Sequence, residues 1–155
     1  TSLVIEVALF NLKKGKTMSK PVCLILGAGA GIGGHVAKRF ASEGYHACLA
    51  RRTDKAGLDK LVAEIEAAGG SASGFILNAV EEGSIEELVT HIEATIGPIA
   101  VAVFNLGAQI GDRGLSSTTL KAFEMGWRMA TFGLFLAATA GLVVHQKGLV
   151  QQLAP

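Results

Sequence analysis

The stretch Leu24–His35, LILGAGAGIGGH, contains five glycines directly after an apolar run. The apolar run, residues 21–26 (PVCLIL), is short and almost continuous, which predicts a strand buried on both faces of a sheet. Residues 31–43 then carry apolar side chains at helical spacing, and Gly44 follows where a helix C-cap is expected. The segment therefore predicts a strand, a glycine-rich turn and a helix in immediate succession.

The same alternation of strand and helix patterns continues along the chain. Further strands are predicted at 46–50, 72–77 and 99–105, with amphipathic helices at 54–70, where Asp54 is a possible cap, and at 84–97. Parallel strands joined by right-handed helical crossovers satisfy this order most simply. We predict an α/β fold, a Rossmann-like three-layer sandwich whose parallel sheet has at least four strands in the order 3-2-1-4.

Composition excludes several classes of function. The 155 residues fit one domain, and the net charge of +1 gives no reason to expect nucleic acid or an anionic membrane as a partner. Cys23 and Cys48 lie within apolar runs, which indicates buried thiols of a cytoplasmic protein. His46, His91 and His145 are widely separated, so we predict no metal site.

The glycine-rich turn is a candidate phosphate-binding site. Missing β-carbons permit positive φ and close approach of an anion, and the following helix N-terminus offers free N–H groups. The candidate residues are Gly27, Gly29, Gly31, Ile32 and Gly33. Glycines in a tight turn can also serve packing alone, but the position inside a strand–helix–strand unit favours binding of a dinucleotide.

The end of the second predicted strand selects between the two nicotinamide dinucleotides. A carboxylate at this place accepts hydrogen bonds from the ribose of NAD, whereas this sequence has Arg51 and Arg52. A guanidinium binds a 2′-phosphate through charge-assisted hydrogen bonds. NADP(H) is therefore favoured over NAD(H) as the cofactor, and the alternative is that the two arginines form a solvated strand edge.

Taken together, these motifs resemble those of the short-chain dehydrogenase/reductase family. The resemblance rests on the glycine spacing of GAGAGIG (27–33), the arginine pair, FNLGA (104–108) and the long helical segment 123–140. It extends over roughly residues 21–150, which correspond to the nucleotide-binding half of the family.

The family resemblance implies roles for individual residues. The glycine turn would hold the pyrophosphate, and Arg51 and Arg52 would hold the 2′-phosphate. Asn78 stands where the family has an aspartate that contacts the adenine, and Asn105 and Gly107 match a turn near the cofactor ribose.

The resemblance also implies an oxidoreductase that moves a hydride to or from a small carbonyl or alcohol substrate, with a Ser and a Tyr-x-x-x-Lys motif for proton transfer. The single tyrosine, Tyr45, is followed at that spacing by Leu49. We therefore name no catalytic residue and expect an inactive, truncated form of such an enzyme; whether it is an enzyme stays open. The alternative is a non-catalytic dinucleotide-binding or self-associating module.

A long helical pattern occupies residues 118–146. Its centre, 129–144, has sixteen residues without a charge, fewer than the ~20 that span a bilayer. We expect no membrane span and instead a homo-oligomer formed through this helix, because its apolar face and the outer edge of the fourth predicted strand have no expected cover.

The first residues are treated separately from the domain. Met18 is followed by Ser-Lys-Pro, which runs directly into the first predicted strand. The short apolar run before it contains Glu6 and has its lysines on the wrong side for a secretory signal. We predict that residues 1–17 are an upstream or non-native extension and that 18–155 form a partial NADP-binding domain.

Overall fold

The computed structural model describes residues 7–9, 19–107 and 114–141. They divide into two compact units. The first contains the described residues of Thr1–Asn78 and Thr90–Asn105, and the second contains those of Ala79–Val89 and Leu106–Pro155. The first unit holds the sheet, and the second holds the long C-terminal helix.

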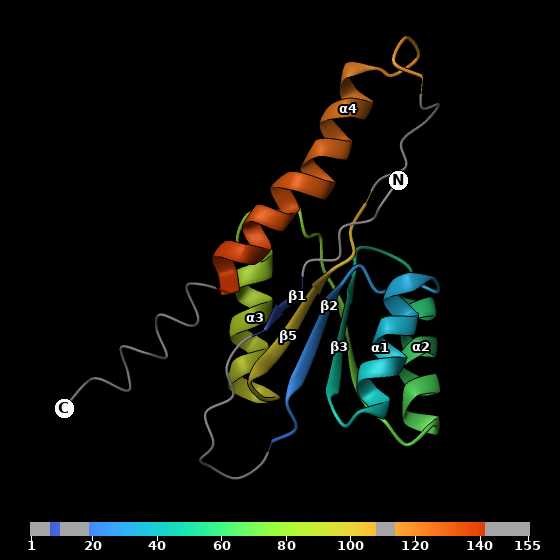
Figure 1. Cartoon of the computed structure of the whole chain (residues 1–155), viewed down its shortest axis with the longest axis vertical. Helices are drawn as coiled ribbons and strands as arrows, with labels where there is room; N and C mark the ends of the chain where they lie inside the picture. Colours follow the sequence, from blue (N-terminus) through green and yellow to red (C-terminus); the bar gives the residue numbers. More distant parts are fainter. Residues whose placement is uncertain (1–6, 10–18, 108–113, 142–155) are drawn as a thin grey trace, which may run out of the picture. The chain divides into compact units, whose positions relative to one another are not determined.

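A five-stranded sheet forms the centre of the first unit, with the strand order β1-β5-β2-β3-β4 (Figure 1). Four strands are parallel neighbours: β2 (Val22–Leu26), β3 (His46–Arg51), β4 (Ser71–Ile76) and β5 (Ile99–Phe104). Counted along the chain, these four lie in the order 3-2-1-4, so the predicted parallel sheet is confirmed. Every residue of the central strand β2 is buried, which accounts for its unbroken apolar sequence.

The short strand β1 (Val7–Leu9) extends the sheet beyond β5. It pairs antiparallel with β5, with Val7 opposite Val103. The expectation that the outer edge of β5 is open was therefore wrong, because a three-residue apolar segment carries too little periodicity to reveal such a strand. Whether residues 1–17 are an extension stays a prediction.

Helices α1 (Ile32–Ser42) and α2 (Lys55–Ala67) pack on one face of the sheet, on the right of Figure 1. Gly74 on β4 makes room for α2, because a β-carbon there would lie 2.9 Å from Cγ of Leu58. A cluster of buried apolar side chains fills this layer, among them Cys23, Ile25, Ala37, Leu49, Leu58, Leu61 and Ile65.

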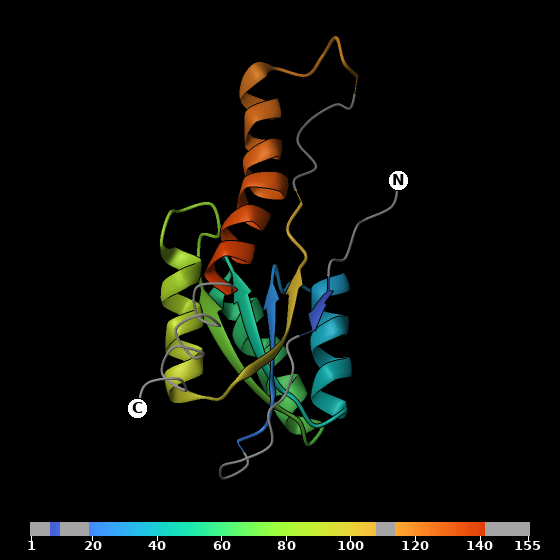
Figure 2. The same cartoon turned by 60° about the vertical axis from the view of Figure 1, so that its left-hand side comes forward.

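The C-terminal part of α3 (Ser84–Thr95) covers the other face, as Figure 2 shows. Its His91 ring meets the ring of Phe75 on β4 edge-on, with centroids 5.9 Å apart. Phe75 follows Gly74 along the strand, so the two residues face opposite sides of the sheet. The first unit is therefore a three-layer sandwich of helix, sheet and helix, as the sequence predicts.

The second unit contains α4 (Leu120–Trp127), which begins at a cap where Ala122 N–H donates to Thr119 Oγ1 at 3.1 Å. One π-helical turn, η1 (Arg128–Phe132), follows, and helical conformation continues to residue 141. Within the predicted range 118–146, helix is thus present from Leu120 to residue 141, and the last five residues of the range lie outside the described part. Among the described residues, no helix combines the length and apolar character needed to span a membrane.

Candidate dinucleotide-binding site

Backbone hydrogen bonds gather predicted site residues of the first unit at the edge where the parallel strands end. They continue the ladder past the strands: Asn105 N–H to Leu26 C=O at 2.8 Å, Gly27 N–H to Ala50 C=O at 2.8 Å, and Leu77 N–H to Arg51 C=O at 2.9 Å. Each chain segment is thereby fixed beside the end of its neighbour. Polar side chains and the glycine turn share this edge in the order Asn105, glycine turn, Arg51 and Asn78.

Two glycines of the turn are required by the backbone itself. Gly27 has a φ of +97°, a conformation that L side chains rarely adopt. At Gly33, an added β-carbon would overlap the carbonyl oxygen of Gly27. Asn105 Nδ2 donates to that same oxygen at 3.1 Å. Gly27, Gly33 and Asn105 therefore fix the shape of the turn.

The other two predicted glycines border open space. A β-carbon added at Gly29 or Gly31 would meet no heavy atom within 4 Å. Gly31 is the N-cap of α1 and supplies no side-chain hydrogen bond to the first turn, and Ile32 is 52% exposed. Uncapped N–H groups beside open space fit a pyrophosphate, which needs close approach to the backbone and a partial positive charge.

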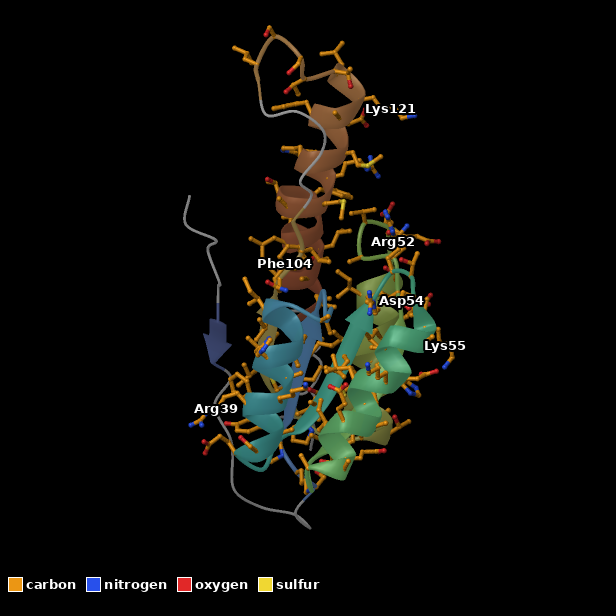
Figure 3. All side chains as sticks on the ribbon, turned by 90° about the vertical axis from the view of Figure 1, so that its right-hand side faces the viewer. Arg39, Arg52, Asp54, Lys55, Phe104 and Lys121 are labelled. Atoms are coloured by element: carbon orange, nitrogen blue, oxygen red, sulfur yellow. The ribbon has the colours of Figure 1, made fainter. Side chains whose placement is uncertain are left out.

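The two arginines at the end of β3 differ in their surroundings. Arg51 is partly buried, and its Nη2 lies 3.1 Å from Oδ2 of Asp54. Arg52 is exposed, and it makes no ion pair with any side chain that the structure describes. Figure 3 shows Arg52 and Asp54 at the same end of the sheet as Phe104, and Arg39 at the opposite end.

Asp54, at this same edge, makes one contact that was predicted and one that was not. It caps α2 as expected, by accepting the Gly57 N–H at 2.9 Å. Its ion pair with Arg51 was not predicted, because a spacing of three residues indicates contact only along a helix, and Arg51 is the last residue of a strand.

Asn78 and Gly107 are the two remaining residues that were predicted to bind the cofactor. Asn78 is exposed two residues after the end of β4, at the strand-end edge. Gly107 is exposed and belongs to the second unit. The cofactor contacts of both, like those of the glycines and arginines, stay predictions.

The described residues offer no ready catalytic group at this edge. Tyr45 packs edge-on against Phe40, with ring centroids 5.2 Å apart, and belongs to the border of the core. Cys23 and Cys48 are free and fully buried, and burial raises the pKa of each thiol to about 12, so neither is a thiolate near neutral pH. Within the described part of the chain, no group of three or more His, Cys, Asp or Glu could hold a metal ion.

This chain is similar to known proteins both in sequence and in three-dimensional structure. A 3-oxoacyl-(acyl-carrier-protein) reductase from Thermotoga maritima is 38% identical over 86 residues, which are 56% of this chain and 35% of that protein. A short-chain dehydrogenase/reductase from Burkholderia xenovorans has a TM-score of 0.76 and 29% identity, covering 83% of this chain and 52% of that one. The F189W actinorhodin polyketide ketoreductase with NADPH has a TM-score of 0.72 and 26% identity, over 78% and 46%.

The chain therefore spans about half, or less, of the length of these relatives. The family model for short chain dehydrogenases matches residues 21–150, which include all four parallel strands and every predicted site residue. This chain belongs to the short chain dehydrogenase family.

Proposed function

We propose that residues 18–155 bind NADP(H) at the edge where the parallel strands end. The observation that carries the proposal is the open, uncapped turn at Gly29 and Gly31, one strand away from the arginines at the end of β3. The pyrophosphate would lie against the first turn of α1, and Arg52 and Arg51 would face the adenosine 2′-phosphate. Family membership supports binding of a nicotinamide dinucleotide.

The choice of NADP(H) over NAD(H) rests on charge. Arg51 is the last residue of β3 and Arg52 follows it, at the place where a carboxylate would serve NAD. A nicotinamide cofactor supplies a hydride when bound, and one structural relative contains NADPH. We propose hydride exchange with a small carbonyl or alcohol as the reaction of the lineage.

This chain has no residue that we assign to proton transfer. Its single tyrosine packs on Phe40, and the residue four positions later is Leu49 rather than a lysine. We therefore propose that this chain binds the dinucleotide and does not turn over a carbonyl substrate. Free, buried thiols support a cytoplasmic location.

Fluorescence titration with NADPH and with NADH, followed by a carbonyl-reduction assay at 340 nm, tests the proposal. We expect saturable binding of NADPH, weaker binding of NADH, and no oxidation of NADPH above the rate without protein. Failure of both nucleotides to bind would overturn the proposed site. Turnover of a carbonyl substrate would show that another group supplies the proton.

A second candidate, a self-associating module, is favoured by the second unit. Leu120 is 90% exposed and Phe123 is 68% exposed on α4, and exposed apolar side chains of this size commonly mark an interface. We propose a homo-oligomer formed through residues 118–146. Dinucleotide binding and self-association are compatible, and only the assay of turnover separates an enzyme from a module.

A further inference from the structure

Asp54 is held in an unusual backbone conformation beside the proposed 2′-phosphate site. Its φ of +59° makes it the one non-glycine residue with positive φ among those described. Conformations of this kind cost free energy and persist where surrounding contacts fix them. Here the contacts are the Gly57 N–H, which donates to Oδ1 at 2.9 Å, and the Arg51 guanidinium, 3.1 Å from Oδ2.

Gly57 completes the arrangement from the first turn of α2. A β-carbon at this position would overlap Oδ2 of Asp54 and lie 3.1 Å from Nη1 of Arg51. The sequence therefore leaves out a side chain where the carboxylate and the guanidinium meet. Three residues, Arg51, Asp54 and Gly57, combine to keep a negative charge against one of the two arginines.

The contact changes the charge that the site presents to a phosphate. Arg51 already pairs with a carboxylate, and its side chain is only 23% exposed. Arg52 is exposed and has no ion-pair partner among the described residues. The two arginines and Asp54 together carry a formal charge of about +1 rather than +2, because the carboxylate offsets one guanidinium.

We infer that Asp54 is a specificity-determining residue of the proposed cofactor site: its carboxylate engages Arg51, weakens the preference for a 2′-phosphate, and leaves Arg52 as the guanidinium that binds this group. The inference rests on the proposed function. It assigns to Asp54 a role beyond capping α2, and it predicts unequal roles for two adjacent arginines.

Asp54→Asn removes the negative charge and keeps the backbone conformation and the helix cap. Asparagine tolerates the left-handed region, and its side-chain oxygen can still accept the Gly57 N–H. Asp59→Asn is the matched control, because Asp59 lies on α2, the helix that Asp54 caps, and pairs with a lysine, Lys55, at 2.6 Å. Both variants remove one exposed negative charge from α2 or its N-cap, but only the first removes the partner of Arg51.

The test is the ratio of the dissociation constants for NADPH and NADH, measured by titration at low and at physiological salt. For Asp54→Asn we expect NADPH to bind about three- to tenfold more tightly, a gain limited by solvent screening and smaller at high salt. NADH affinity should stay within about twofold, and Asp59→Asn should leave both affinities within the same limit.

The arginines supply the second arm of the test. Arg52→Gln should weaken NADPH binding by at least about tenfold, because a charge-assisted bond to phosphate is lost, whereas Arg51→Gln should weaken it by less than about threefold. A structural role for Asp54 alone would change both nucleotides together and leave their ratio unaltered.

The possible failures are distinct. If the unmodified chain binds neither nucleotide, the proposed function falls and this inference falls with it. If it binds NADPH but Asp54→Asn leaves or lowers the NADPH preference, or Asp59→Asn raises it equally, only the role of Asp54 is overturned. Asp54→Gly also accepts positive φ, and it must shift the ratio in the same direction if Asp54→Asn fails to fold.

Discussion

At Gly33 an added β-carbon would overlap the carbonyl oxygen of Gly27, whereas at Gly31 it would meet no heavy atom within 4 Å. The two glycines lie two residues apart in the same turn, yet one is required by the packing of the protein itself. The other borders the space where we place the pyrophosphate. The same substitution at the two positions therefore separates folding from binding.

Gly33→Ala should lower the free energy of unfolding by about 1–3 kcal/mol, since the backbone must shift to accept the methyl group. Gly31→Ala should cost about 1 kcal/mol or less, because alanine is only a poorer N-cap there. Gly31→Ala should nevertheless weaken NADPH binding at least about tenfold by occupying the open space. Urea denaturation and NADPH titration of both variants provide the measurements; equal losses of stability would contradict the assignment.

The sequence predicted the residue content of this edge better than its contacts. The glycine turn and the arginine pair follow from composition at strand ends, which is local information. The contact of Arg51 with Asp54 depends on a positive φ at Asp54 and on the absence of a side chain at Gly57. Nothing in the spacing of charges reveals a left-handed aspartate, so the pairing could be recognised only in the structure.

At the scale of secondary structure, the predictions were accurate where glycine marks a helix end. Gly44 and Gly69 have φ values of +91° and +82° just after α1 and α2, so those ends were visible in the sequence. The π-helical turn η1 was not predicted, because one extra residue in a turn leaves the apolar pattern almost unchanged. Trp127 and Phe132 stack across this turn with ring centroids 5.9 Å apart.

Helix α4 presents Leu120, Phe123 and Trp127 at spacings of three and four residues, which places them along one exposed stripe. If this stripe is the proposed interface between copies, a charge within it must oppose association. Phe123→Glu should convert the oligomer largely to monomer at micromolar concentration, as measured by light scattering. Lys121→Glu introduces the same side chain at an exposed position of α4 outside the stripe and should leave the mass unchanged. A monomeric unmodified chain would contradict the interface.

For the whole chain, the unexpected element is β1, which covers the outer edge of β5. An uncovered edge strand offers unpaired N–H and C=O groups to other chains, and β5 has the apolar sequence IAVAVF. None of the predicted site residues lies on β1, and hydrogen bonds from β2, β3 and Asn105 fix the glycine turn. Cofactor binding and protection of the edge should therefore be separable.

Deletion of residues 1–17 tests this separation. The shortened chain, which begins at Met18, should bind NADPH with an affinity within about twofold of the full chain, because the strand-end contacts remain. It should also form larger species by light scattering, because the freed β5 edge can pair with a second copy. Adding Phe123→Glu to the deletion distinguishes the two routes: edge pairing persists in the double variant, whereas association through α4 is lost. If the shortened chain loses NADPH binding, the first residues contribute to the site and are more than an extension.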